Sequence, residues 1–499
     1  MQKKFFITTP IYYSNGIPHI GHAYSSLIAD TIAKSKKLDG IEVKFCTWVD
    51  ENSQKVVESA TAENMEVMAY ADMMAGKHKA VWDGLHIEYT DFIRTTEPRH
   101  KELVQKVLQK SFDNGDIYEW VYEGKYCVGC EAFKKESDLV EKDGTFTCPD
   151  HPNKPLQDLK EKNYFFRLSK YQDRLLQFYE ERKDFIVPSN RYQEVIEFVR
   201  GWLDDFSVSR ETNKFGIPLP FDPEQVTYVW YDALFNYVTV CEGQEEKWWP
   251  ADLHVIGKDI VRFHAIYWPA MLWSAWYDVP HQLLVTGHFT VDGQKMSKTI
   301  WNVIDPVAYI GEYSRDLLLN YLFSAFPIGE DGDFDRKEAV TQFNAKLSNN
   351  LGNLLNRSLT LALKLPEGKV PGFEDALIAW KRDDYISKYV WYMDTFDLRS
   401  ALECSFAFST ELNQYIDERK PWKMDVSIPE EKKALEETLG TVLTWLAHLA
   451  YNLSPFFEEK MLELLGRIGV GKWWEATHGF TIKEKGEPLY MRIESKNPA

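Results

Sequence analysis

The sequence predicts a doubly wound α/β fold with a parallel sheet, split by a zinc-bearing insertion and followed by an α-helical bundle. Three observations lead to this prediction. A strand, a loop, a helix and a second strand follow one another within the first 50 residues. A second group of short apolar runs begins near residue 227, and from residue 341 onward apolar residues recur at helical spacing.

Residues 1–116 form the first half of the predicted sheet. Strand-like runs at 5–9 and 42–49 flank a loop that contains proline and glycine and a helix with an apolar stripe. The second run ends at the acidic pair Asp50 and Glu51. The helical stripe consists of Ala23, Leu27, Ile28, Ile32 and Ala33.

Residues 225–340 supply the second half, with buried-strand candidates at 228–231, 254–257 and 283–285. The segment between the halves, 117–224, holds a cysteine cluster and is interpreted as an insertion into one fold. Residues 341–499 are predicted to be a helical bundle. Its first apolar stripe consists of Phe343, Leu347, Leu351, Leu354 and Leu355.

The composition excludes several classes of protein. The 499 residues are 44% hydrophobic and 27% charged, with no uncharged apolar run of ~18 residues, which argues against a membrane span. The N-terminus lacks the apolar stretch of a secretory signal, so we expect a cytoplasmic protein. The net charge of -18 argues against general polyanion binding. The helical part is nearly neutral, so nucleic acid can bind there at the lowest electrostatic cost.

Four residues have the spacing of a zinc site. Cys127 and Cys130 are separated by two residues, and 17 residues later Cys148 and His151 repeat that spacing. Four soft ligands leave no open position on tetrahedral Zn²⁺, so the role is structural. The alternative is a set of thiols that are only neighbours. The other three cysteines are expected to be small buried apolar residues: Cys46, Cys241 and Cys404.

Two loops carry residues suited to phosphate. His19 and His22 flank Gly21 at the start of a helix, where backbone N–H groups favour anions. Lys295 and Lys298 bracket Met-Ser in a second loop and can stabilise a transferring triphosphate. Taken singly, each loop has an ordinary alternative, a capped histidine pair or a solvated lysine loop.

Together these loops resemble the two signature sequences of class I aminoacyl-tRNA synthetases, which implies a Rossmann-like core. Within that class the chain is similar to methionyl-tRNA synthetases over nearly its whole length. The stretches that carry the resemblance are Thr9–Gly16, Tyr126–Glu131, Asn163–Ser169, Val229–Leu234 and Ile256–His264.

The resemblance implies a methionine pocket, with Asp50 on the α-ammonium group. Aromatic walls suit a polarizable thioether at ~0.3–1.5 kcal/mol per contact, and Tyr237 or His264 could offer the sulfur a polar group. The pocket residues are Ile11, Tyr13, Trp230, Ala233, Leu234, Tyr237, Phe263 and His264.

The implied reaction is attack of the methionine carboxylate on the α-phosphate of ATP, followed by transfer to tRNA(Met). His19 and His22 would stabilise the phosphates, with Lys295 and Lys298 on the leaving pyrophosphate; Mg²⁺ is expected with ATP. The resemblance also places Arg210 near the active site.

In the helical part, Asn353, Arg357 and Trp422 resemble the anticodon-reading elements of the family. Asn353 and Arg357 lie four apart on one helix face and can bond to unstacked bases, while Trp422 can stack on a base for ~1–3 kcal/mol. The alternative for Trp422 is an ordinary residue of an interhelix core.

The chain departs from the family pattern at several positions, most of them between Trp48 and Ser53. Trp48 stands where glycine is usual and Asn52 where histidine is usual, which puts the local backbone beside Asp50 in doubt. Thr299 replaces a serine and keeps the hydroxyl, and Phe215 replaces a tryptophan. None of these changes removes a charged catalytic group.

Three other functions compete with this interpretation. One is another class I synthetase of the leucyl, isoleucyl, valyl or cysteinyl type, although the insertion is short for an editing domain. The second is a non-catalytic tRNA-binding paralogue, and the third is a nucleotidylyltransferase, which leaves Asn353, Arg357 and Trp422 unexplained. We expect a monomer.

Overall fold

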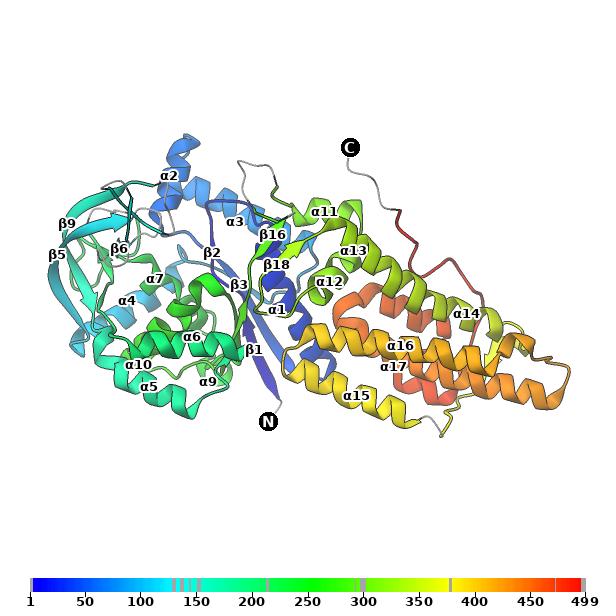
Figure 1. Cartoon of the computed structure of the whole chain (residues 1–499). Helices are drawn as coiled ribbons and strands as arrows, with labels where there is room; N and C mark the ends of the chain where they lie inside the picture. Colours follow the sequence, from blue (N-terminus) through cyan, green and yellow to red (C-terminus); the bar gives the residue numbers. More distant parts are fainter. Residues whose placement is uncertain are drawn as a thin grey trace. The chain divides into compact units, whose positions relative to one another are not determined.

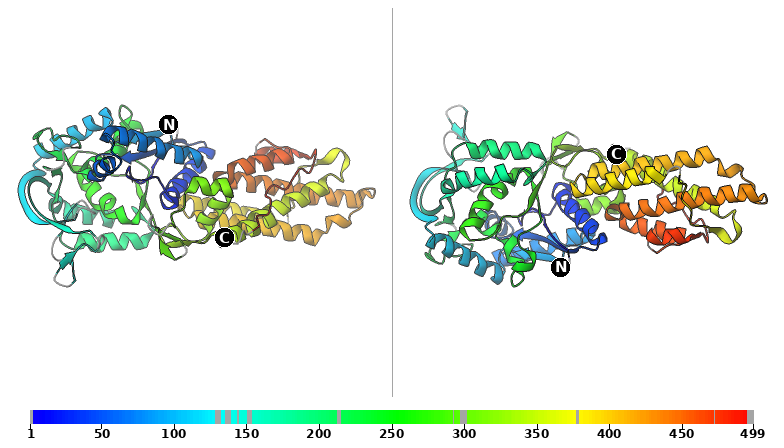
Figure 2. Two further views of the ribbon diagram at one scale, coloured as in Figure 1. Left: turned by 90° about the horizontal axis from the view of Figure 1, so that it is seen from above. Right: turned by 90° about the horizontal axis from the view of Figure 1, so that it is seen from below.

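The computed structural model describes residues 3–127, 132–134, 139–142, 145–149, 154–211, 215–291, 293–296, 302–376, 379–471 and 473–494. The chain forms two compact units, each built from two stretches of sequence (Figures 1 and 2). Met1–Pro18 and Glu42–Val285 form the sheet unit, and His19–Ile41 and Thr286–Ala499 form the bundle unit.

The sheet unit is built on a seven-stranded sheet in the order β10-β15-β14-β1-β3-β2, with β4 also paired to β3. Strand β1 runs parallel to both β3 and β14, with Ile7 opposite Phe45 and Leu253. The strand order therefore reverses between β14 and β1, and the carboxyl ends of strands at such a point are where doubly wound folds bind ligands. These strands are β1 (Lys4–Thr8), β2 (Tyr12–Tyr13), β3 (Glu42–Asp50), β4 (Asp91–Arg94), β10 (Ile186–Val187), β14 (Leu253–Gly257) and β15 (Gln282–Thr286).

Four of the predicted strands are confirmed, and one is wrong. Residues 228–231 do not continue a strand: β13 (Val226–Thr227) ends before them, and helix α7 (Val229–Ala233) follows. A short run of aromatic and β-branched residues fits a buried helix as well as a buried strand, so composition alone could not decide.

The predicted insertion contributes a separate antiparallel sheet in the order β11-β9-β5-β6. Its long hairpin pairs β5 with β9, from Ile117 opposite Phe166 to Cys127 opposite Leu156. The same stretch also supplies β10 to the main sheet. The strands of this sheet are β5 (Ile117–Cys127), β6 (Ala132–Lys134), β9 (Leu156–Phe166) and β11 (Phe206–Ser207). Three further strands of the insertion lie outside this sheet, with β7 (Val140–Lys142) paired to β8 (Thr145–Thr147) and β12 (Ser209–Arg210) paired to β13.

One continuous apolar core joins the main sheet to its helices. Phe6 of β1, Leu108 of α4 and Val195 of α6 are fully or almost fully buried in it. The helices of the unit are α2 (Gln54–Ala62), α3 (Val67–Gly84), α4 (Pro98–Asp113), α5 (Gln172–Glu181), α6 (Ser189–Arg200), α7, α8 (Asn236–Thr239), α9 (Glu245–Trp248) and α10 (Trp268–Ser274), with a π-helical turn at Phe263–Tyr267.

The bundle unit joins helix α1 (Ile20–Leu38) to long C-terminal helices that lie side by side (Figure 1). Both predicted stripes are confirmed, because every residue of each is buried. Where the second stripe was predicted to be α-helical, the helix widens to a π-helix over Asn344–Gly352. The helices are α11 (Pro306–Glu312), α12 (Arg315–Ser324), α13 (Arg336–Phe343), α14 (Asn353–Ala362), α15 (Ala379–Asp394), α16 (Leu398–Arg419) and α17 (Pro429–Ile468).

Two small sheets complete the bundle unit. One has the order β17-β16-β18, with β16 (Phe289–Val291), β17 (Gln294–Lys295) and β18 (Gly332–Phe334), and the other pairs β19 (Lys369–Val370) with β20 (Phe480–Thr481). The second signature loop therefore follows a strand of a small sheet that is separate from the doubly wound sheet. Among the described residues, no helix is both long and apolar enough to cross a membrane.

Candidate active site

Aromatic side chains from three segments meet at the carboxyl edge of the main sheet. The rings of Trp230 on α7 and Phe263 on the π-helical turn are stacked, with centroids 3.8 Å apart and an interplanar angle of 6°. Tyr13 of β2 meets Trp230 edge-on at 6.5 Å. Ile11, Tyr13 and Phe263 are partly exposed and pack against the buried core, so this cluster lies where the core opens to the surface.

The remaining predicted pocket residues are buried beside this aromatic cluster. Ala233 and Leu234 lie one turn along from Trp230, and Tyr237 follows on α8. The structure thus brings together residues from three segments, the first of which lies more than 200 positions before the other two. Their side chains give a surface of the apolar kind that small ligands occupy.

Tyr237 and His264 are joined by a hydrogen bond of 2.7 Å between the phenol oxygen and Nε2. His264 Nδ1 contacts the carbonyl oxygen of Ile260 at 3.0 Å, so Nδ1 carries the ring proton and Nε2 accepts from Tyr237. Burial lowers the pKa of His264 to about 4, so the ring is neutral at pH 7. The Tyr237 proton is directed to His264, which leaves its oxygen as an acceptor in this arrangement.

Trp48, the first departure from the family pattern, is a core residue of β3. Its ring meets Tyr237 at 4.3 Å and 76°, and it is fully buried. The strand stays regular through this position, with Trp48 opposite Ile93 and Tyr13 opposite Asp50. Trp48 therefore packs against the Tyr237 ring without disturbing the strand that carries Asp50.

Asp50 ends strand β3 and is held by its backbone and its side chain. Its carbonyl oxygen accepts from the N–H and the hydroxyl of Ser14, at 3.1 and 2.9 Å. The backbone N–H of Asn52 donates to Asp50 Oδ1 at 3.3 Å. A carboxylate fixed in this way at the sheet edge suits an ammonium group.

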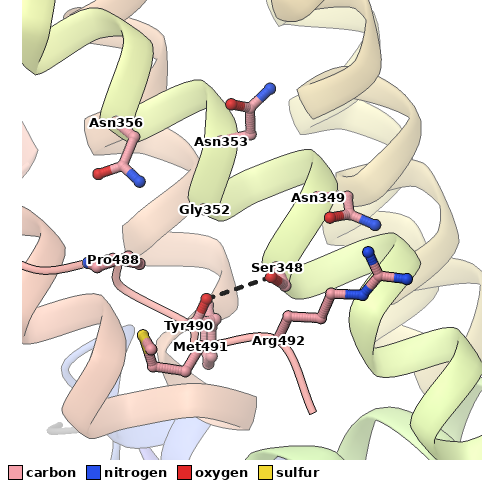
Figure 3. Close-up of a pocket in the computed structure, with 9 residues that line it drawn as sticks. All are labelled: Ser348, Asn349, Gly352, Asn353, Asn356, Pro488, Tyr490, Met491 and Arg492. Atoms are coloured by element: carbon pink, nitrogen blue, oxygen red, sulfur yellow. Dashed lines mark hydrogen bonds between the residues drawn. The ribbon is translucent and has the colours of Figure 1, made fainter. Parts of the chain in front are cut away.

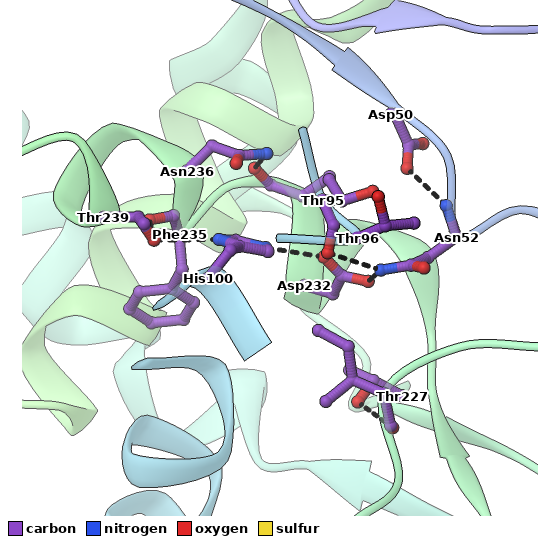
Figure 4. A network of polar contacts seen from close by, with 12 residues as sticks. Asp50, Asn52, Thr95, Thr96, His100, Thr227, Asp232, Phe235, Asn236 and Thr239 are labelled. Atoms are coloured by element: carbon purple, nitrogen blue, oxygen red, sulfur yellow. Dashed lines mark hydrogen bonds and ion pairs between the residues drawn. The ribbon is translucent and has the colours of Figure 1, made fainter. Parts of the chain in front are cut away.

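A buried polar network continues from Asn52 (Figure 4). Its side-chain amide donates to Asp232 of α7, which also pairs with His100 of α4. Sequence reasoning did not select His100 or Asp232 as site residues. Asp232 lies inside the stretch Val229–Leu234 that carries the resemblance, but its partner is 132 positions away and no local pattern connects the two.

In the bundle unit, the two signature histidines cap helix α1. His19 Nδ1 accepts from the Gly21 N–H at 3.1 Å, and His22 Nδ1 accepts from the His19 N–H at 3.2 Å. Each neutral ring therefore carries its proton on Nε2, which is the kind of donor that a phosphate oxygen requires. A methyl group on Gly21 would lie 3.0 Å from His19 Cε1 and 3.1 Å from Met296 Cε, so glycine keeps this helix start open.

The second signature loop begins at the β16–β17 hairpin. Gly293 takes a φ of 74° at its turn, and its N–H donates to Asp333 at 2.8 Å. The backbone of Lys295 pairs with Thr290 in this hairpin. Lys298 and Thr299 lie outside the described residues.

Arg210 lies on β12, which pairs with the strand leading into α7. Its Nη1 donates to Ser207 Oγ at 2.9 Å and to the Ser209 carbonyl at 2.8 Å, and the guanidinium lies 4.2 Å from the ring centre of Tyr228. Arg210 is opposite Val226 in the paired strand, and the Tyr228 ring that it contacts lies two residues before Trp230 in the sequence. Phe215 is partly buried in the loop that follows.

Of the four predicted zinc ligands, Cys127 and Cys148 are described, and both are fully buried. Cys130 and His151 lie outside the described residues, and within the described part of the chain no three histidine, cysteine or acidic side chains form a metal-binding group. Of the other cysteines, Cys46 and Cys241 are buried, as expected, whereas Cys404 is half-buried. Burial raises the pKa of the Cys241 and Cys404 thiols to about 12.

The bundle unit holds a pocket of about 490 Å³ between the helix start at Asn353 and the C-terminal segment (Figure 3). Arg357 turns instead toward α16, where it contacts Asp417 and Asn413 and lies 5.6 Å from the ring centre of Trp422. Trp422 is 44% exposed and is not an interhelix core residue. The pocket is lined by Ser348, Asn349, Gly352, Asn353, Asn356, Pro488, Tyr490, Met491 and Arg492.

Comparison with known proteins gives one consistent family. The family described as "tRNA synthetases class I (M)" matches residues 5–155 and 151–359. The methionine–tRNA ligase of Thermosynechococcus vestitus is 40% identical over 484 residues, covering 94% of this chain and 90% of that protein. The enzyme of Fusobacterium nucleatum is 41% identical over 519 residues, covering 99% and 80%.

A solved structure agrees with these sequence relatives. The Mycobacterium tuberculosis methionyl-tRNA synthetase in complex with methionyl-adenylate superposes with a TM-score of 0.93 at 34% identity, over 98% of this chain and all of that one. The chain therefore belongs to the methionyl-tRNA synthetase family of class I aminoacyl-tRNA synthetases.

Proposed function

We propose that this chain activates methionine with ATP and transfers it to tRNA(Met). In the first step a methionine carboxylate oxygen bonds to the α-phosphorus of ATP while the bond to the bridging oxygen breaks, giving methionyl-adenylate and pyrophosphate. In the second step a ribose hydroxyl of the tRNA attacks the activated carbonyl carbon, and AMP leaves. Neither step needs a nucleophilic side chain, so the protein acts by positioning and electrostatics.

The stacked pair Trp230 and Phe263, with Tyr13 at its edge and Asp50 in register beside Tyr13, carries the methionine part of this proposal. A flat aromatic surface suits the thioether, and a fixed carboxylate suits the α-ammonium group. Ala233 and Leu234 would complete the apolar wall.

The hydrogen bond between Tyr237 and His264 sets how the sulfur is recognised. Because the Tyr237 hydroxyl donates to Nε2 of a neutral His264, neither group presents a charge to the thioether. A buried pocket without charge favours methionine over polar amino acids of similar size.

The N-terminus of α1 and the rings of His19 and His22 are assigned to the phosphates of ATP. Both imidazoles carry Nε2 protons because their Nδ1 atoms accept backbone N–H groups. Lys295 and Lys298 are assigned to the leaving pyrophosphate, and Arg210 to a supporting cation near the pocket. Mg²⁺ bound to ATP would neutralise part of the phosphate charge.

Zinc is assigned a structural role in the insertion. Cys127 and Cys148 are buried thiols, which fits the burial expected of ligands in a closed tetrahedral site. Cys130 and His151 would complete the ligand set. Bound Zn²⁺ would stabilise the insertion and take no part in the reaction.

The pocket beside Asn353, together with Trp422 and Arg357, is assigned to the anticodon. Asparagine amides supply both donors and acceptors for base edges, and a half-exposed tryptophan beside an arginine gives a surface on which a base can stack. We also propose that the enzyme is cytoplasmic and that, without bound tRNA, it is a monomer. Light scattering at micromolar concentration tests the oligomeric state.

Exchange of pyrophosphate into ATP tests the first step. Each of the twenty amino acids is tested separately, with the zinc-loaded chain. Exchange with methionine alone is the expected result. Exchange with another amino acid would indicate a different class I synthetase, and exchange with none, from a folded chain that still binds tRNA, would indicate a non-catalytic tRNA-binding protein.

A further inference from the structure

The buried polar network of the sheet unit connects two parts of the proposed methionine pocket. Asn52 Nδ2 donates to Asp232 Oδ2 at 2.8 Å and to the carbonyl oxygen of Thr95 at 3.1 Å. The backbone N–H of the same residue donates to Asp50 Oδ1. One asparagine therefore contacts both the carboxylate assigned to the ammonium group and the helix that carries Trp230 (Figure 4).

Asp232 is held on its other side by a histidine. His100 Nε2 lies 2.9 Å from Asp232 Oδ1, and His100 Nδ1 lies 2.8 Å from the hydroxyl oxygen of Thr239. Asp232, His100 and Thr239 are completely buried. A buried carboxylate is costly unless it is paired and hydrogen-bonded, and here each of its oxygens has a partner.

The positions of the protons follow from counting donors and acceptors. The Thr239 hydroxyl has one proton and donates it to the Phe235 carbonyl oxygen, which can only accept. The two oxygens are 3.0 Å apart. The hydroxyl oxygen must then accept from His100 Nδ1. The second proton lies between His100 Nε2 and Asp232 Oδ1, so the pair has no net charge and Asp232 Oδ2 accepts from Asn52.

Helix α7 carries two consecutive anchoring residues between two residues that are assigned to the pocket. Tyr231 donates to Ser111 at 2.8 Å and Asp232 joins the network, whereas Trp230 and Ala233 belong to the pocket wall. Any shift of Asp232 therefore moves the aromatic wall.

Asparagine at position 52 fits this arrangement closely. Its single amide nitrogen has two N–H groups, and both are used, on Asp232 and on Thr95. An imidazole nitrogen, as in the histidine usual in the family, carries at most one N–H. Asparagine in place of the usual histidine thus gives the loop beside Asp50 one nitrogen that donates two hydrogen bonds.

We propose that Asn52, Asp232 and His100 are positioning residues for methionine recognition, which fix helix α7 relative to the Asp50 carboxylate. This inference rests on the proposed function. None of the three is assigned a contact with substrate. Their role is to set the spacing between the aromatic wall and the ammonium site, so their loss should weaken methionine binding selectively.

Asp232→Leu tests the proposal in the pyrophosphate exchange assay. The substitution removes both carboxylate oxygens, so Asn52 and His100 lose their common partner. We expect the KM for methionine to rise at least tenfold, with the KM for ATP within twofold of the parent value. Asp232→Asn is the conservative variant, because its oxygen accepts from Asn52 and its N–H donates to Nε2 of a neutral His100, and we expect it to recover at least threefold of that loss.

Asp205→Leu is the matched control. Asp205 is a carboxylate of the same unit that accepts from Ser169 N, Ser169 Oγ and Tyr118 Oη at 2.7–3.0 Å, on segments that carry no pocket residue. Both KM values should stay within twofold. If Asp232→Leu does not fold, Thr239→Val removes only the hydroxyl opposite His100, and a threefold rise in the KM for methionine is expected.

Three results would overturn the inference while the proposed function stands. They are an unchanged KM for methionine in the variant that folds, an equal rise in the KM for ATP, or an Asp232→Asn variant no better than Asp232→Leu. Failure of the parent chain to exchange with methionine would instead overturn the proposed function, and this inference with it.

Discussion

The two proposed recognition sites are built in opposite ways. In the methionine pocket the polar groups are paired with one another, Tyr237 with His264 and Asn52 with Asp232, so the pocket surface is left to aromatic rings. In the bundle unit the pocket is lined by asparagine amides and Arg492.

The difference reflects what each ligand offers. A thioether has almost no hydrogen-bonding capacity, so a pocket selects it by shape and by the absence of polar groups. A nucleobase has several donors and acceptors and a flat face, so amides and an exposed ring are needed. Substitutions in the methionine pocket should therefore change methionine-dependent pyrophosphate exchange, whereas substitutions at the bundle site should change the charging of tRNA.

Asp50→Asn should have the largest effect, because Asp50 is the one charged group assigned to methionine itself. Leaving a buried ammonium group without its partner costs about 3–5 kcal/mol, so kcat/KM for methionine in the exchange assay should fall by roughly 10²–10³-fold or more. Asp113→Asn, on an exposed carboxylate of α4 that pairs only with Gln109 among the contacts of the described residues, is the control. A loss of less than tenfold would exclude Asp50 from ammonium binding.

Trp230→Leu tests whether the stacked pair selects the thioether. Losing the ring removes its stacking on Phe263 and part of the pocket wall, worth about 1.5–3 kcal/mol, so kcat/KM for methionine should fall roughly 10–100-fold and discrimination against leucine should narrow. Trp202→Leu, at a side chain 81% exposed, should leave both unchanged. Equal effects of the two substitutions would remove the pocket assignment.

Trp422→Ala should separate the bundle site from the methionine pocket. Loss of a base-stacking surface costs about 1–3 kcal/mol, so kcat/KM for tRNA should fall roughly 5–100-fold while methionine-dependent exchange stays at the parent rate. Trp380→Ala, at a ring 63% exposed on α15 of the same unit, is the matched control. Unchanged charging by Trp422→Ala would mean that the anticodon binds elsewhere.

His264→Gln should change how stability depends on pH. Burial lowers the pKa of His264 to about 4, whereas an unfolded histidine titrates near 6.5. Between these values the unfolded chain takes up a proton that the folded chain excludes, so the free energy of unfolding falls as the pH falls. His264 contributes at most about 1.4 kcal/mol per pH unit to this slope. The variant should lack that contribution when the free energy of unfolding is measured by urea titration at pH 7, 6 and 5. An identical slope in both proteins would show that His264 is not buried as a neutral ring.

Sequence reasoning succeeded where the signal was local. The strands at β1, β3, β14 and β15 and the stripe of α1 follow from short patterns that the fold leaves intact. The residues proposed for the pocket were predicted through family motifs and not through periodicity, because they lie on three separate segments.

The errors and omissions have nonlocal causes. Residues 229–231 have the composition of a strand, and they fold as a helix whose Asp232 finds its partners in α4 and in the loop after β3. Trp48 raised doubt because the sequence does not show that Tyr237 covers it. The spacing of Asn353 and Arg357 does not show that Arg357 has an acidic partner, Asp417, 60 positions away on α16, and the role of Arg357 at the anticodon stays a prediction.

The discontinuity of the bundle unit has a consequence for synthesis on the ribosome. Helix α1 buries Asp30, whose partner is Arg315, and Lys34, which also pairs with Glu458. At ~5–20 residues per second, the stretch 42–285 delays those partners by on the order of 10–50 s. During that interval a nascent α1 exposes both charges and its apolar stripe, so it should be a site for chaperone binding. Protection of residues 20–38 from protease should appear only in chains extended beyond Glu458.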